Sequence, residues 1–206
     1  MNPSVDPRSV QDDLSALKNE VAKLRDENIK LRHEVVTLNA YLGEVESVAD
    51  SDSLTPLPNR RRFLRELQRV IHYVARYESG AALLYVDVDD LEGINDNYGH
   101  HAGDAALIHV ATKLRDALRS TDIVARIGGD EFGLLIDPID EKDVPAKIES
   151  LRAAICATIL VVEGVPVRGG VSVGYTMIRG DDDAASVLAR ADASMYVTKR
   201  AQRSAK

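Results

Sequence analysis

The chain has 206 residues, of which 45% are apolar and 29% charged, a composition typical of one globular domain with an extension. A net charge of −7 disfavours nonspecific binding to DNA or to an anionic membrane, because both need a positive field. The longest apolar stretch, residues 153–162, is about half of what a membrane-spanning helix needs, and the N-terminus lacks a signal-peptide pattern. We therefore expect a cytoplasmic protein that binds neither DNA nor membranes. Cys156, the single cysteine, excludes an intrachain disulfide, and its apolar neighbours predict that it is buried.

Residues 10–48 carry an uninterrupted heptad repeat. The d positions are Leu17, Leu24, Leu31 and Leu38, and the a positions are Leu14, Val21, Asn28, Val35 and Leu42. Valine at a with leucine at d favours a parallel two-stranded coil, and a buried asparagine fixes its register. Three of the four g–e′ pairs of such a dimer join opposite charges. An amphipathic helix packed on its own domain is the alternative, but it needs neither the 3.5-residue repeat nor the matched charges.

The tail before the coil, residues 1–9, contains one arginine and two prolines. It therefore lacks the long basic helix with which basic-zipper proteins enter the major groove of DNA. The coil is expected to hold a homodimer together, and a regulatory protein that docks on it is a further expected partner.

Ser51, Asp52, Pro56 and Pro58 mark a joint after the coil, and we place one domain at residues 49–206. Helices are predicted over residues 59–77, 102–120, 144–157 and 184–202, and strands over 81–88, 123–127, 131–137, 159–162 and 167–177. The turn Gly128-Gly129-Asp130 predicts a hairpin between the second and third strands. This mixed order predicts an α+β domain whose largely antiparallel sheet is covered by helices.

Acidic residues gather where two of these strands meet loops. Asp87 and Asp89 end an apolar strand, and Asp130 and Glu131 lie in the hairpin turn. Carboxylates in such positions suit a hard cation such as Mg²⁺, which prefers oxygen ligands and shares them with phosphates. Taken alone, Gly-Gly-Asp more often marks a polar hairpin tip without chemistry.

The segment Arg126-Ile-Gly-Gly-Asp-Glu-Phe132 resembles the signature of the GGDEF family of diguanylate cyclases. The other segments that resemble the family are Leu54-Thr-Pro-Leu-Pro-Asn-Arg60, Asp87-Val-Asp89, Ile94-Asn95-Asp96-Asn-Tyr-Gly-His100, Gly103-Asp104, Ala191-Asp192, Met195-Tyr196, Lys199 and Arg203. The resemblance spans roughly residues 52–203. It implies a nucleotidyl-cyclase-like fold with a ferredoxin-like core, and condensation of two GTP into cyclic di-GMP and two pyrophosphates across a homodimer.

The resemblance also implies residue roles at the acidic turn. Asp87, the backbone carbonyl of Val88 and Asp130 would bind two Mg²⁺ ions per active site, for which Mn²⁺ could substitute. Glu131 would help to activate the 3′-hydroxyl, as a general base or as a further metal ligand. Gly128 and Gly129 would let the backbone approach the triphosphate, since glycine has no Cβ.

Four further residues are implied to hold the substrate. Asn95 and Asp104 would read guanine, whose N1–H and exocyclic amine both donate to a carboxylate. Their alternative roles are a turn cap and support of a helix N-terminus. Lys199 and Arg203, four residues apart on one helix face, would bind phosphates, and a solvated basic helix end is the alternative.

Arg119-Ser-Thr-Asp122 begins nine residues before Gly128, where many members of the family carry an Arg-x-x-Asp site for inhibition by the product. The resemblance implies that Arg119 and Asp122 bind cyclic di-GMP.

The chain departs from the family pattern at Leu91-Glu92, where Phe-Lys is common, and at Pro56 and Gln202, where glycine is common. A carboxylate in place of the lysine would repel phosphate by roughly 3 kcal/mol at about 6 Å and an effective dielectric near 20. A catalytically weak domain that acts as a receptor or scaffold for GTP or cyclic di-GMP is therefore the alternative function. A dimerisation protein without chemistry is a second alternative.

Overall fold

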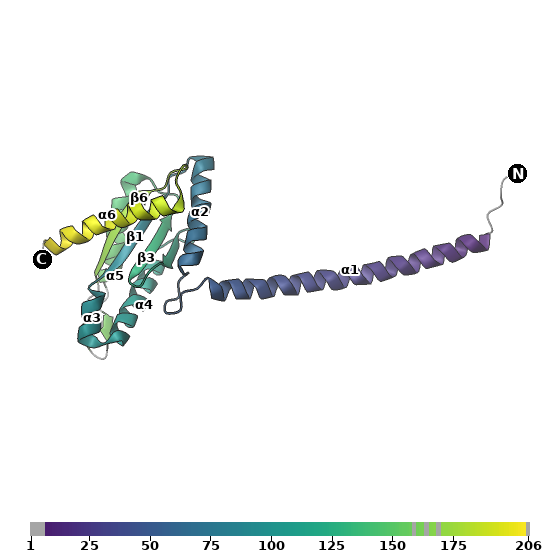
Figure 1. The fold of residues 1–206 in the computed structure, drawn as a ribbon, viewed down its shortest axis with the longest axis horizontal. Helices are drawn as coiled ribbons and strands as arrows, with labels where there is room; N and C mark the ends of the chain where they lie inside the picture. Colours follow the sequence, from purple (N-terminus) through teal and green to yellow (C-terminus); the bar gives the residue numbers. More distant parts are fainter. Residues whose placement is uncertain (1–6, 158–159, 163–164, 168–169, 205–206) are drawn as a thin grey trace. The chain divides into compact units, whose positions relative to one another are not determined.

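The computed structural model describes residues 7–157, 160–162, 165–167 and 170–204. The chain divides into two compact units, residues 1–49 and 50–206. Figure 1 shows the first unit as a single helix and the second as a sheet with helices packed on it. None of the described helices is both long and apolar enough to cross a membrane.

The first unit is the helix α1, Pro7–Ala49, which covers the heptad segment. Those of its large apolar side chains that the structure describes are 40% to 68% exposed in the single chain, and they include Leu17, Val21, Leu24, Leu31, Val35 and Leu38. Asn28 accepts a hydrogen bond from Arg32 Nε at 2.7 Å. Because exposed leucine is unfavourable in water, the stripe is suited to a second helix, and dimerisation through it stays a prediction.

The second unit is built on one four-stranded antiparallel sheet in the order β2-β3-β1-β6. The strands are β1 Ala82–Asp89, β2 Ile123–Arg126, β3 Glu131–Ile136 and β6 Gly170–Met177. The short strands β4 Leu160–Val162 and β5 Val165–Val167 form a separate hairpin. The predicted antiparallel α+β class is confirmed.

Helices cover both faces of this sheet. The helices that follow α1 are α2 Arg60–Tyr77, α3 Leu91–Tyr98, α4 His100–Asp116, the 3₁₀ turn η1 Glu141–Asp143, α5 Val144–Cys156 and α6 Ala184–Ser204. One buried cluster joins the sheet to α4 and α5, and a second joins it to α2 and α6. Because side chains alternate along a strand, β1 sends Val86 and Val88 to the first cluster and Leu83 and Tyr85 to the second.

Several predicted elements were wrong in detail. The helix expected over residues 102–120 begins at His100 and ends at Asp116, and the strand expected over 167–177 is two strands, β5 and β6. Residue 159, where another strand was expected to begin, lies outside the described residues. Cys156 is exposed rather than buried, because its neighbour Ile155 takes the inward face of α5.

The helix α3 was not predicted. Only Ile94 among its eight residues is buried, so it has no apolar repeat to read. Asp90 before it and Gly99 after it adopt positive φ angles of 56° and 82°, which turn the chain sharply at both ends. These turns place α3 directly after the acidic end of β1.

Candidate active site

The strands β1 and β3 bring two of the predicted site residues together. Asp87 and Glu131 are direct partners in the antiparallel register of β1 and β3. Both lie on the face covered by α2 and α6, as the alternation from Tyr85 requires. Directly opposed like charges are unfavourable in a sheet, so this pairing needs compensation by a cation or a proton.

Lys199 of α6 supplies a cation in this structure. Its Nζ lies 2.5 Å from Asp87 Oδ1, and the Asp87 side chain is only 8% exposed. Burial raises the pKa of Asp87, and the charges of Asp130 and Asp89 raise it further, while the hydrogen bond from Lys199 lowers it. The ionised form of Asp87 therefore needs a positive charge close to its carboxylate.

The turn between β2 and β3 is joined to the end of β1 by the backbone. The Val88 N–H donates to the carbonyl oxygen of Asp130 at 3.0 Å, so the two predicted metal-binding segments are adjacent. Ser172 of β6 donates to Asp89 Oδ1 at 2.7 Å and so engages one oxygen of this carboxylate.

The residues at the ends of β1 and of the Gly-Gly turn offer ligand atoms that suit a divalent metal ion. They supply carboxylate and backbone oxygens, and an ammonium group already sits against Asp87. Among the described residues, no three His, Cys, Asp or Glu side chains are gathered closely enough to form a complete metal site.

Gly128 and Gly129 differ in their surroundings. A Cβ on Gly128 would lie 2.1 Å from Glu131 Oε2, whereas a Cβ on Gly129 would meet nothing within 4 Å. Gly129 thus leaves open space, as an approaching triphosphate would need. Gly128 makes room for the Glu131 carboxylate, which the sequence did not suggest.

The predicted guanine-reading residues lie on two helices that pack together, α3 and α4. Asn95 lies on α3, and Asp104 follows Gly103 on α4. A Cβ on Gly103 would lie 2.0 Å from Asn95 Oδ1, so the Asn95 carboxamide occupies the space that glycine leaves. Asp104 is exposed at the start of α4 and free to face a ligand. Guanine recognition by the pair stays a prediction.

Arg126 is a residue whose role sequence reasoning missed, although it opens the signature segment. Its Nε and Nη2 donate to the Gly129 carbonyl at 3.1 and 2.6 Å, and its Nη1 contacts Asp52 Oδ1 at 3.2 Å. Asp52 Oδ1 also accepts from the backbone and hydroxyl of Thr55, both at 2.7 Å. One guanidinium therefore ties the hairpin turn to the opening segment of the domain.

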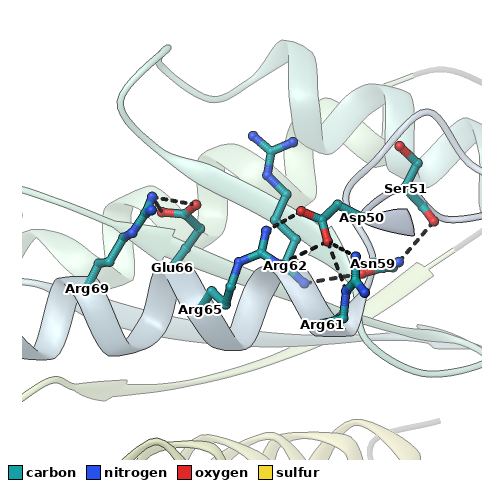
Figure 2. Close-up of polar contacts among 8 residues, drawn as sticks. All are labelled: Asp50, Ser51, Asn59, Arg61, Arg62, Arg65, Glu66 and Arg69. Carbon is teal, nitrogen blue, oxygen red and sulfur yellow. Dashed lines mark hydrogen bonds and ion pairs between the residues drawn. The ribbon is translucent and has the colours of Figure 1, made fainter. Parts of the chain in front are cut away.

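Asp50, the first residue of the second unit, forms ion pairs with two arginines of α2 (Figure 2). Its Oδ1 accepts from Arg61 at 2.7 and 3.0 Å, and Arg65 makes ion-paired contacts with both carboxylate oxygens. Asn59 caps the N-terminus of α2 by accepting from Arg62 N at 3.2 Å and donates to the Ser51 carbonyl at 3.1 Å. The arginines lower the pKa of Asp50 to about 2.

Arg119 and Asp122 lie at the opposite end of β2 from the Gly-Gly turn. They line a surface cavity of about 510 Å³ together with Lys147 of α5 and Asp140. Asp122 accepts from the Arg119 backbone N–H at 3.1 Å, and Lys147 Nζ lies 3.9 Å from Asp122 Oδ2. The second cation at this place, Lys147, was not identified from the sequence.

The remaining sequence predictions fall outside these contacts. Glu92 is exposed in the first turn of α3. Arg203 lies in the last turn of α6, and its side chain is outside the described part of the molecule.

Comparison with known proteins agrees with this geometry. The family model "Diguanylate cyclase, GGDEF domain" matches residues 49–205. The chain is 36% identical over 157 residues to the diguanylate cyclase TpbB of Pseudomonas aeruginosa, a match that covers 75% of this chain and 36% of TpbB. It thus spans about a third of the length of that relative.

Two solved structures match most of this chain. One is the coiled coil and GGDEF domain of DgcB from Caulobacter crescentus in complex with c-di-GMP (TM-score 0.76, 28% identity, 87% of this chain and 94% of that one). The other is the diguanylate cyclase SiaD of Pseudomonas aeruginosa with its activator SiaC (TM-score 0.76, 27% identity, 94% and 76%). The chain belongs to the GGDEF domain family.

Proposed function

We propose that this protein is a diguanylate cyclase that condenses two GTP into cyclic di-GMP and two pyrophosphates. The observation that carries the proposal is the register that sets Asp87 opposite Glu131 beside the Gly-Gly turn, with Lys199 against Asp87. It is supported by membership of a family named for this activity and by relatives that carry the same name.

Asp87, the Val88 carbonyl and Asp130 would hold two divalent ions, Mg²⁺ or Mn²⁺. When bound, such ions neutralise phosphate charge and lower the pKa of a coordinated hydroxyl. Glu131 would accept the proton of the 3′-hydroxyl, whose oxygen forms a bond to the α-phosphorus of the second nucleotide. The bond from that phosphorus to the pyrophosphate oxygen breaks, and the same exchange in the other direction closes the ring.

The substrate would be oriented by residues on α3, α4 and α6. Asn95 and Asp104 would accept and donate along the guanine edge, while adenine offers an acceptor at N1 that Asp104 rejects. Lys199 would leave Asp87 and contact the phosphates together with Arg203.

A homodimer would bring two such sites face to face. The exposed stripe of α1 is suited to a parallel coil, and tethering raises the effective concentration of one domain near the other. A regulatory protein as a further partner is supported by the complex of SiaD with its activator, and we place its docking site on the coil. Sedimentation of the purified chain tests the dimer, and a monomer at micromolar concentration would contradict it.

The cavity at Arg119 and Asp122 would bind the product as an inhibitor. Two cations, Arg119 and Lys147, line it and suit the two phosphates of cyclic di-GMP. Binding of a cyclic di-GMP in the neighbour DgcB supports the proposal. Replacing Arg119 with alanine should raise the product concentration at which the reaction halts.

The direct test is incubation of the protein, stripped of bound nucleotide, with GTP and MgCl₂, followed by chromatography. Cyclic di-GMP and pyrophosphate in a 1:2 ratio would support the cyclase. A dimeric, ligand-free sample that binds GTP without product would favour a receptor instead.

A further inference from the structure

The helix α6 carries exposed apolar side chains beside the candidate active site. Tyr196 and Val197 are 58% and 68% exposed, although they follow Met195, which is buried in the cluster under α2 and α6. Lys199, on the same turn of the helix, contacts Asp87. The exposed pair therefore lies at the rim of the site and takes no part in the core of its own domain.

An arginine extends this surface. Arg200 Cζ lies 5.9 Å from the centroid of the Tyr196 ring, a cation–π geometry, and the Arg200 side chain is itself exposed. Residues four apart in a helix face the same way, so the ring and the guanidinium present one surface. We call Tyr196, Val197 and Arg200 the α6 rim. Aromatic residues and arginine are enriched at protein–protein interfaces, so this composition suits contact with another protein surface.

The helix α3 forms a second rim of the same site, with the opposite charge. It begins two residues after Asp89, the last residue of β1. Glu92 and Asp96 are four residues apart on α3, and both side chains are exposed. Neither carboxylate forms an ion pair with another residue that the structure describes. We call this pair the α3 rim.

The proposed reaction brings both rims against a second domain. Each 3′-oxygen must come within about 3–3.5 Å of the α-phosphorus that the other domain holds, so side chains around the two sites meet. In a two-fold pair, a residue i that contacts residue j of the partner implies that j contacts i of the partner. The two rims of one domain can therefore meet either their own copies or each other.

Charge decides between these arrangements. Two α6 rims face to face would oppose two Arg200 guanidinium groups, and two α3 rims would oppose four carboxylates, which is unfavourable. An α6 rim against an α3 rim pairs Arg200 with Glu92 and Asp96, and the two-fold axis makes this pairing twice. We propose that the α6 rim docks on the α3 rim of a second copy of this chain when the two active sites meet. The inference rests on the proposed function and adds the contact that aligns the two domains.

Reversing one charge on each rim tests the contact. Arg200→Glu places a glutamate against the partner's Glu92, and Glu92→Lys places a lysine against the partner's Arg200. Each variant alone should lose turnover at saturating GTP roughly tenfold, because like charges then face each other twice. Arg200→Glu should still bind a non-hydrolysable GTP analogue within about twofold of the wild-type affinity, measured by calorimetry. Arg69→Glu reverses an exposed charge on α2 and is the matched control, with turnover like the wild type.

A mixture of the two variants distinguishes a contact between chains from an effect within one chain. In a dimer with one copy of each, the new glutamate faces the new lysine, and the unchanged Arg200 faces the unchanged Glu92. After exchange of subunits, turnover of the mixture should exceed the mean of the two separate variants several-fold. A mixture that only reaches this mean would overturn the inference.

Crosslinking detects the contact without turnover. In a Cys156→Ser background, which removes the exposed native thiol, Val197→Cys and Asp96→Cys are placed in chains with tags of different mass. With the GTP analogue bound, mild oxidation should join the two tagged chains. Ile108→Cys, exposed on α4, replaces Asp96→Cys in the control pair and should give far less of the mixed product.

The two measurements separate the docking from the cyclase assignment. Crosslinking no stronger than in the control pair would overturn the docking even if cyclic di-GMP is made. A crosslink specific to residues 96 and 197 in a chain that makes no cyclic di-GMP would uphold the docking, and the cyclase assignment would fail.

Discussion

The ammonium of Lys199 lies 2.5 Å from Asp87 Oδ1, at the carboxylate proposed to bind metal. A side chain from the last helix thus neutralises the most buried acid of the site. A metal ion bound at Asp87 would compete with Lys199 for the same oxygen, so the arrival of a divalent ion would require Lys199 to move. The same lysine would then become available to substrate phosphates.

Lys199→Met should therefore change metal and nucleotide affinity in opposite directions. Mn²⁺ binding without nucleotide should tighten several-fold because the competitor is gone, while GTP binding should weaken about tenfold, equivalent to about 1.4 kcal/mol. Calorimetric titrations measure both. Arg200→Met removes the neighbouring cation, which lies over Tyr196, and should change neither affinity. Parallel weakening of both in Lys199→Met would contradict the competition.

Gly103→Ala should impair nucleotide selection without unfolding the domain. Alanine favours a helix over glycine by about 1 kcal/mol, but its Cβ would displace the Asn95 carboxamide. We expect the KM for GTP to rise about tenfold, measured by initial rates. If displacement of Asn95 is the cause, Asn95→Ala and Gly103→Ala should not add in the double variant; additive losses would argue against it.

Arg126→Lys should lower kcat and leave dimerisation unchanged. Lysine keeps the charge but lacks the fork that reaches the Gly129 carbonyl and Asp52 together. The hairpin turn should lose its fixed position, and kcat should fall about tenfold in the chromatographic assay. Arg115→Lys, in an exposed ion pair with Asp116, is the control. Equal rates for both variants would show that the turn needs no such support.

Asp50→Asn should destabilise the domain in a pH-dependent way. The folded-state pKa of Asp50 is lowered from 3.8 to about 2, so its ionised form stabilises the fold above pH 3.8, and this contribution disappears as the pH falls to about 2. The Tm difference between wild type and Asp50→Asn should be present at pH 7 and vanish near pH 2 in thermal melts. Glu66→Gln breaks only the surface pair with Arg69 and should shift the Tm little. A constant difference across the range would argue against the ion pairs.

Asn28→Val should change the oligomeric state or register of the coil. A valine at this a position removes the polar residue that fixes the register. The dimer can then become more stable, and coils with another register or another number of helices are no longer disfavoured. Sedimentation mass and turnover measure the effect. Unchanged mass and turnover would show that Asn28 does not set the register, and Asn19→Val at the outer f position serves as the control.

The sequence predicted the sheet, most helices and the acidic turn because long apolar repeats and the signature segment encode them. It missed α3, whose short length and single buried residue leave no periodicity. The contact of Arg126 with Asp52 was also missed, since it joins residues far apart in the chain. Such pairings follow from strand register and helix packing, which local patterns do not specify.

The strand β1 is hydrogen-bonded to β3 on one edge and β6 on the other, and helices bury both of its faces. Its backbone amides should therefore exchange with solvent only when the domain unfolds globally. The nucleotide would thus meet a strand that is fixed on the timescale of turnover. Regulation of this protein would act on the encounter of two domains, since Asp87 lies on the strand that is last to move.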